Sequence, residues 1–110
     1  MKLPNGNAAI MSPEKVRDYL LSAAHPIGRY KFTFFRSLGY QQDRWETLDR
    51  DIRALIAGDA KPLELTEYGK KYAVRGIVTG PNGRSARIVS IWIILTAENV
   101  PRFITAYPED

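Results

Sequence analysis

The stretch KKYAVRGIVTGPNGRSARIVSIWIIL, residues 70–95, decides the fold of this chain. Residues 70–79 and 84–95 are rich in β-branched and aromatic side chains, which is typical of strands. GPNG (80–83) between them indicates a turn, because Pro81 presets φ at the second turn position and Gly83 can adopt positive φ. The stretch therefore predicts a β-hairpin, and its second strand is apolar enough to lie centrally in a sheet.

Two further strands flank this hairpin in the sequence. KPLELTE (61–67) alternates weakly between apolar and polar residues, and RFITAY (102–107) reads as a last short strand after the loop AENVP (97–101). The second half of the chain is therefore predicted to form four strands, joined mainly as hairpins.

The residues before Gly58 follow a helical period instead. Ser12 is a predicted N-cap for a first helix that runs to about residue 24, where Pro26 stops it. A short second helix is expected from residue 28 or 29 to Leu38, with Gly39 as its C-cap.

A third helix is indicated by the clearest apolar stripe, and Gly58 ends it. The stripe consists of Trp45, Leu48, Ile52, Leu55 and Ile56. Helices that precede an antiparallel meander are typical of the α+β class. We therefore expect a single domain over residues 1–110, with two to three N-terminal helices packed on one face of a four-stranded antiparallel meander sheet.

Composition restricts the class of function. The chain has no Cys, which excludes thiolate chemistry and favours a reducing compartment, so we expect a cytoplasmic protein. Its longest apolar run, residues 88–95, is far shorter than the roughly 18 residues of a membrane helix. The formal net charge of +4 favours polyanionic partners such as RNA.

Metal and phosphate-loop chemistry find no support in the sequence. One His and no Cys leave no transition-metal site, and the acids of the third helix alternate with arginines, as on a solvated helix face. GPNG lacks the Gly-Lys-Ser/Thr ending of a phosphate-binding loop. No cofactor is therefore expected.

His25 and Lys31 are the candidate residues for chemistry that needs no metal. Cleavage of RNA through its own 2′-hydroxyl needs a base, an acid and cations that stabilise the charge on phosphorus. His25 has the side chain suited to act as base or acid, and Lys31 is close enough in sequence to supply the charge. The alternative is that His25 is only a turn residue before Pro26.

The parity of two strands bears on where a site would lie. Ser90 and Trp92 share one parity, and Thr105 and Tyr107 share another. If the strands that carry them pair, both sets can point to the same face of the sheet. Parity leaves open whether that face is exposed to a ligand or buried under the helices.

Several short motifs, in order along nearly the whole chain, resemble those of a known family. The motifs are KLPN, HPIGRYKFTFF followed by SLGY, YGKKYAV, GPNGR, SIWI and PRFITAY. Together they resemble a small bacterial domain of unknown function, found alone and as the C-terminal module of predicted polymorphic or phage toxins. Such modules are grouped with the barnase–EndoU–colicin–RelE-like ribonucleases.

The resemblance implies a set of site residues and an activity. The recurring polar positions of the family fall here on His25, Lys31, Arg102, Thr105 and Tyr107. Tyr30 departs from the pattern, since relatives often carry a second His there. The resemblance implies a metal-independent endoribonuclease of toxin type, in which Lys31 and Arg102 stabilise phosphate charge while Thr105 and Tyr107 position it or relay a proton.

Two alternatives remain open. In the first, the chain is a non-catalytic binding module of a two-protein operon, and its partner is a cognate antitoxin or immunity protein. In the second, it is a degenerate family member that keeps only the fold. The unpaired edges of a meander sheet suit the first of these, because they can pair with a strand of a partner.

Overall fold

A computed structural model describes residues 1–24 and 29–109 of the chain. Its helices are α1 (Pro13–Lys15), continued by a π-helical turn (Val16–Leu20), α2 (Arg29–Ser37) and α3 (Trp45–Ala54). Short 3-10 turns lie at Gly6–Ala8, Gln42–Arg44 and Leu55–Ala57. The strands are β1 (Ala60–Leu65), β2 (Gly69–Thr79), β3 (Ser85–Leu95) and β4 (Arg102–Pro108).

The four strands form one antiparallel meander in the order β1-β2-β3-β4. β2 and β3 pair without interruption from Gly69↔Leu95 to Thr79↔Ser85, and the turn between them has Gly83 at φ 86°. The predicted hairpin is thus confirmed, and so is the α+β class with the helices preceding the sheet.

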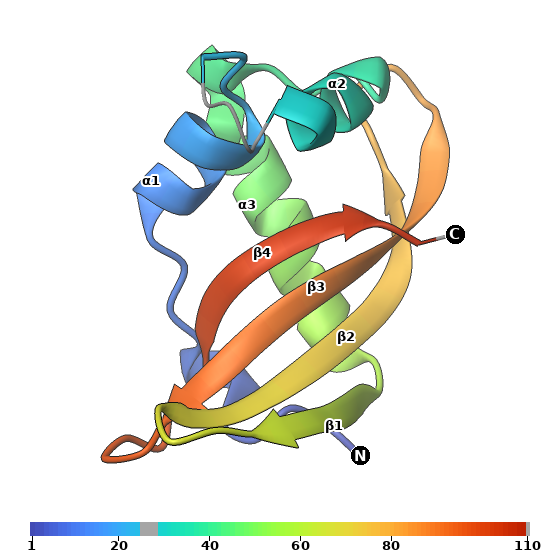
Figure 1. Ribbon diagram of the computed structural model, residues 1–110. Coiled ribbons are helices and arrows are strands. Elements are labelled where there is room, and N and C mark those ends of the chain that lie inside the picture. The colour runs from blue at the N-terminus through green and yellow to red at the C-terminus, as the bar shows by residue number, and fades with distance from the viewer. Residues whose placement is uncertain (25–28, 110) are drawn as a thin grey trace.

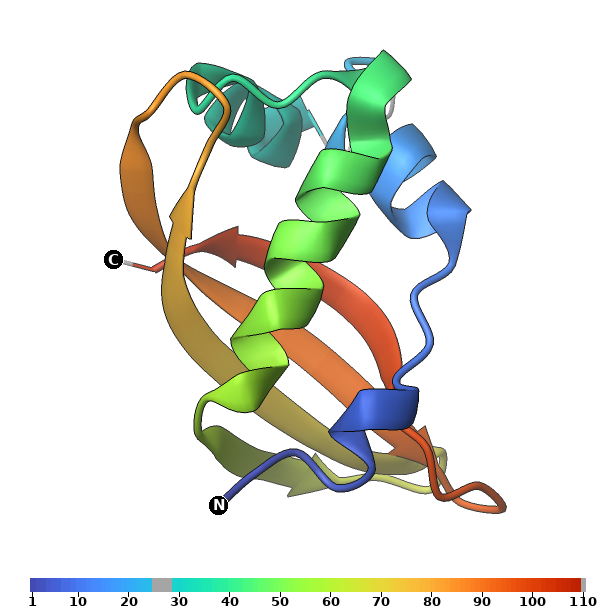
Figure 2. The ribbon, with the colours of Figure 1, turned by 180° about the vertical axis from the view of Figure 1, so that it is seen from behind.

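The two faces of the sheet differ in what covers them. In Figure 2, α3 runs across one face of the sheet, and Figure 1 shows the sheet from the opposite side, where the strands lie in front of α3. α2 lies at one end of the sheet, above β4 in Figure 1. We call the sheet surface that points away from α3 the open face.

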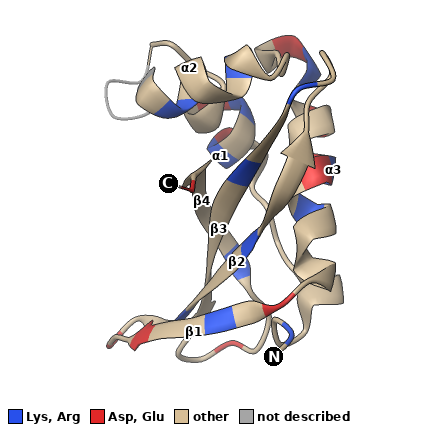
Figure 3. Ribbon diagram, turned by 90° about the vertical axis from the view of Figure 1, so that its right-hand side faces the viewer, with Lys and Arg blue, Asp and Glu red and all other residues tan. Residues whose placement is uncertain are grey.

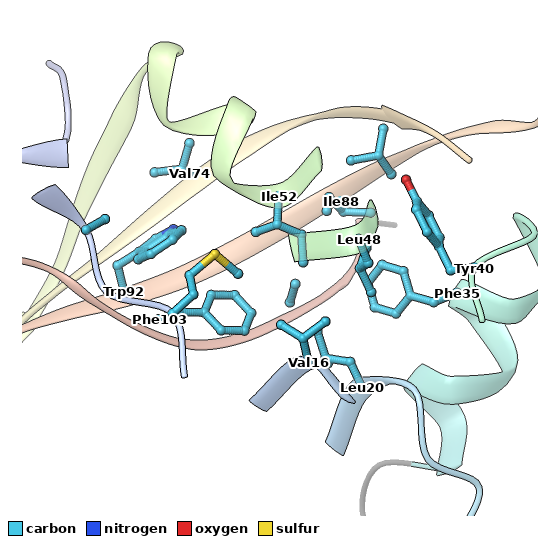
Figure 4. Packing of buried hydrophobic residues seen from close by; sticks show 14 of the residues in the cluster. Val16, Leu20, Phe35, Tyr40, Leu48, Ile52, Val74, Ile88, Trp92 and Phe103 are labelled. Carbon is cyan, nitrogen blue, oxygen red and sulfur yellow. The ribbon is translucent and has the colours of Figure 1, made fainter. Parts of the chain in front are cut away.

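The core lies between the sheet and the helices (Figure 4). Leu48 and Ile52 of α3 are fully buried there, as the predicted apolar stripe requires. Trp92 of β3 meets Phe103 of β4 edge to face, with ring centroids 5.3 Å apart. Burial of these large apolar side chains is the main force that fixes the helices on this face.

Among the residues that the structure describes, Ser90 is the buried residue of the polar class, and it lies in the core. Its hydroxyl donates to the Val74 carbonyl at 2.8 Å and accepts the indole N–H of Trp92 at 3.0 Å. Trp92 can therefore be buried without leaving its N–H unpaired, which would cost free energy.

The first helix ends earlier than its sequence predicts. The expected end near residue 24 is wrong, because the helix closes at Leu20 with a wide turn in which the Leu21 N–H bonds the Val16 carbonyl at 3.0 Å. Leu20 and Leu21, on either side of this closure, are both fully buried. A turn follows, in which the Ser22 hydroxyl accepts the Ala24 N–H.

In the part of the chain that the structure describes, no helix has the length and apolar character needed to cross a membrane.

Candidate functional site

The side chain of Lys31 connects the helical half of the chain to the last strand. Its ammonium donates to the Thr105 hydroxyl of β4 at 2.8 Å and to the Tyr19 hydroxyl at 3.0 Å. It also lies 5.0 Å from the centroid of the Tyr19 ring, within the range of a cation–π contact. Because an ammonium has three donors, these two bonds leave one for a ligand.

No carboxylate of residues 1–24 or 29–109 forms an ion pair with Lys31. Within the described residues, hydroxyls accept its hydrogen bonds and no acid neutralises its charge. A cation held in this way is suited to bind an anion, since no acid has to be displaced first.

A hollow of about 570 Å³ opens beside Lys31 on the open face. We call it the open-face hollow, and it is lined by Tyr30, Lys31, Arg75, Val89, Tyr107, Pro108 and Glu109. Its floor is one row of the sheet, in which Arg75 pairs with Val89 and Val89 with Tyr107. The exposed ring of Tyr30 stands at its rim.

The register of β3 and β4 corrects one expectation from the sequence. Ser90 pairs with Ala106, whereas Thr105 pairs with Ile91 and Tyr107 with Val89. Because paired residues point to the same face, Ser90 and Trp92 face the core while Thr105 and Tyr107 face the opposite, open side. The expectation that Ser90 and Trp92 share a face with Thr105 and Tyr107 is therefore wrong.

A β-bulge in β4 accounts for this arrangement. Trp92 pairs with Phe103 and Ile91 with Thr105, so Ile104 is an extra residue in β4. The extra residue lets Phe103 and Ala106 both reach the core. It also keeps Thr105 and Tyr107 together on the open face.

Arg102 lies away from Lys31. It is three residues from Thr105 along β4, roughly 10 Å of extended chain. Its guanidinium donates to both carboxylate oxygens of Glu98, at 2.8 and 3.0 Å. These hydrogen bonds hold the pKa of Glu98 below its ordinary value and raise the pKa of Arg102. A role for Arg102 at the open-face hollow would require it to leave Glu98.

Of the five residues predicted for the site, the structure joins Lys31 to Thr105 and places Tyr107 in the same hollow. It pairs Arg102 elsewhere, and His25 lies outside the described residues.

Sequence reasoning missed Tyr19 and Arg75 as neighbours of Lys31. Tyr19 lies in the first predicted helix, and its hydroxyl is the part of the side chain that can accept a hydrogen bond from the Lys31 ammonium. Arg75 reaches the hollow only through the register of three strands, and it is itself paired with Glu109 at 2.7 Å. The described groups together offer cations, hydroxyls and aromatic rings on one sheet surface.

Comparisons with known proteins identify the family and the fold. The model of a family described as "Domain of unknown function (DUF6883)" matches residues 2–110, so the chain belongs to this family. Among curated proteins none matches the chain. A solved structure described as "Contact-dependent growth inhibition toxin - immunity protein complex from Klebsiella pneumoniae 342" contains a chain of the same fold, with a TM-score of 0.73 and 17% identity over 96% of this chain and 97% of that one.

Proposed function

We propose that this member of the DUF6883 family is one protein of a toxin–immunity pair and acts by binding a partner protein. The observation that carries the proposal is the open face, a basic sheet surface that α3 leaves uncovered. The similar chain from Klebsiella pneumoniae 342 belongs to a toxin–immunity protein complex and matches over nearly its whole length, which supports the same role here.

The charge of the open face suggests an acidic partner. The register places cations of all four strands on this face, at Lys61, Lys71, Arg75, Arg87 and Arg102, and Lys31 joins them from α2. Figure 3 shows the basic positions spread over β1, β2 and β3. A surface dominated by one sign of charge speeds association with a partner of the opposite sign and selects against others.

Only some of these cations are neutralised within the chain. Lys71, Arg75 and Arg102 pair with Glu64, Glu109 and Glu98. In the described residues Lys61 and Arg87 have no ion pair, and both are exposed. These two residues are therefore the ones whose charge a partner would feel most directly.

Co-expression with the product of the neighbouring gene tests this proposal. We expect the two proteins to purify together, and reversal of charge in Lys61→Glu with Arg87→Glu to weaken binding about tenfold or more. Lys15→Glu is the matched control, because Lys15 is exposed on α1 and carries the same charge. Failure to form a complex, or equal weakening in the control, would reject the role of the open face.

A second candidate function is metal-independent cleavage of RNA by a toxin domain, favoured by the bond between Lys31 and Thr105 beside Tyr107. In this reaction the 2′-hydroxyl of RNA loses its proton and attacks phosphorus, and the 5′ oxygen leaves with a proton, so that a cyclic phosphate forms. His25 would act as base or acid and Lys31 would stabilise the charge on the phosphate. Thr105 holds Lys31, and Tyr107 would position the phosphate or relay a proton.

Incubation of the purified protein with RNA in EDTA tests this second function. We expect Lys31→Met to reduce cleavage at least about a hundredfold, while Lys15→Met, which removes an exposed amine that does not line the hollow, leaves it unchanged. RNA that stays intact over several substrates and pH values would exclude the activity for the free protein. The binding proposal would survive that result.

A further inference from the structure

A second cavity lies behind the sheet edge, between α3 and the turn that joins β2 to β3. Its volume is about 400 Å³, and it has no lining residue in common with the open-face hollow. Its walls come from the start of α3, the segment Gly39–Gln41 and the turn at Thr79–Pro81. A cavity of this size matches the lower range of small-molecule sites.

Two arginines, Arg44 and Arg50, are among the residues that line this cavity. Arg44 lies immediately before α3, and Thr47 and Arg50 are three residues apart within it; all three line the cavity. Arg44 has no ion pair in the described part of the chain. Arg50 is largely exposed, and its Nε lies 3.5 Å from one oxygen of Asp51. Two guanidinium groups beside a hydroxyl are well suited to bind a phosphate.

The cavity also contains an oriented acceptor. The other oxygen of Asp51 accepts a 2.7 Å hydrogen bond from the hydroxyl of Tyr40, a side chain that is buried at the α2 end of the core (Figure 4). Burial is the largest cause of the raised pKa of Tyr40, followed by this bond, so Tyr40 stays protonated and keeps the carboxylate fixed. A fixed carboxylate accepts hydrogen bonds from hydroxyl groups and repels a bare anion.

We propose that this cavity binds a phosphorylated sugar. The phosphate would contact Arg44, Arg50 and the Thr47 hydroxyl, and sugar hydroxyls would donate to Asp51. Phosphate alone would meet the repulsion of Asp51 without the compensating hydroxyl contacts, and sugar alone would lack the charge-assisted bonds. The site therefore selects for the two groups in one molecule. The proposal is independent of the toxin–immunity role, because the four residues proposed to contact the ligand come from α3 and the residue before it and not from the open face.

Isothermal titration with ribose 5-phosphate, inorganic phosphate and ribose tests the proposal on the intact chain at low salt. Ribose 5-phosphate should bind at least about tenfold more tightly than phosphate, and ribose should not bind measurably. Absence of binding up to about 10 mM ribose 5-phosphate would overturn the proposal. Phosphate that binds as tightly as ribose 5-phosphate would overturn it as well.

Variants separate the two halves of the site. Arg44→Gln and Arg50→Gln should each weaken ribose 5-phosphate about tenfold, and both residues are exposed, so the fold should persist. Asp51→Asn should reduce the preference for ribose 5-phosphate over phosphate. Lys15→Gln, which removes an exposed cation of α1 that does not line the cavity, is the control and should have no effect. An equal loss in this control would show general attraction to a basic protein and would contradict a built site.

Discussion

The Lys31 ammonium and the Thr105 hydroxyl are joined by a 2.8 Å hydrogen bond across 74 residues of sequence. The bond links α2 to the edge strand β4 and is partly shielded from water. It therefore fixes the position of the helix over one end of the open face, and it holds the Lys31 charge at the open-face hollow.

This bond predicts an energetic coupling between the two residues. Thr105→Val keeps the side-chain shape and removes the acceptor, whereas Lys31→Met removes the donor. The double variant should be more stable than the sum of the single changes implies, with a coupling of about 1 kcal/mol. Urea denaturation of the four proteins measures it, and simple additivity would show that the bond contributes nothing.

The buried hydroxyl of Ser90 gives a second prediction. Ser90→Ala leaves the Trp92 indole N–H and one acceptor at the Val74 carbonyl without this partner in the core. We expect a loss of about 1–3 kcal/mol in the free energy of unfolding. Ser37→Ala is the control, since Ser37 is exposed and should change stability by less than about 0.5 kcal/mol. Similar losses in both variants would contradict a special role for Ser90.

The sheet was predictable from sequence because its signals are local. GPNG carries its own turn geometry, and β3 starts within one residue of the expected position. The end of the first helix was not predictable in the same way. It closes at Leu20, and the next residues include no Gly or Pro before Pro26, so no local stop signal marks this end.

The candidate site, like the fold, was predictable only in part. Lys31 was predicted from its closeness to His25 and its charge, and the motif resemblance added Thr105 and Tyr107. Arg102 does not join them because Glu98, only four residues earlier, forms a bidentate pair with it. The face on which Thr105 lies depends on the extra residue Ile104, which the alternating pattern does not reveal.

Tyr40 predicts a loss of stability at alkaline pH. Burial and the bond to Asp51 raise its pKa in the folded protein above the ordinary value near 10. Above about pH 10 the unfolded chain loses this proton and the folded chain keeps it. The free energy of unfolding should then fall by up to about 1.4 kcal/mol per pH unit from this group.

Tyr40→Phe isolates this contribution, because the other tyrosines and the lysines titrate in both proteins. The variant should be less stable near neutral pH, and its stability should fall less steeply above pH 10 than that of the wild type. Chemical denaturation at a series of pH values measures both slopes. Parallel curves would show that Tyr40 titrates alike in the folded and unfolded states.

The turn of the β2–β3 hairpin packs so closely on the end of α2 that Gly80 has no room for a side chain. A Cβ at this position would collide with the Leu38 carbonyl, since the turn of β2 and β3 packs directly on the end of α2. Gly83 in the same turn has a positive φ of 86° but open space around it. Gly83→Ala should therefore cost only the backbone strain of about 1 kcal/mol, whereas Gly80→Ala must also push the turn away from the helix and should cost more than about 2 kcal/mol. Chemical denaturation of both variants measures the difference. Equal stability of the two variants would show that the turn has room to move.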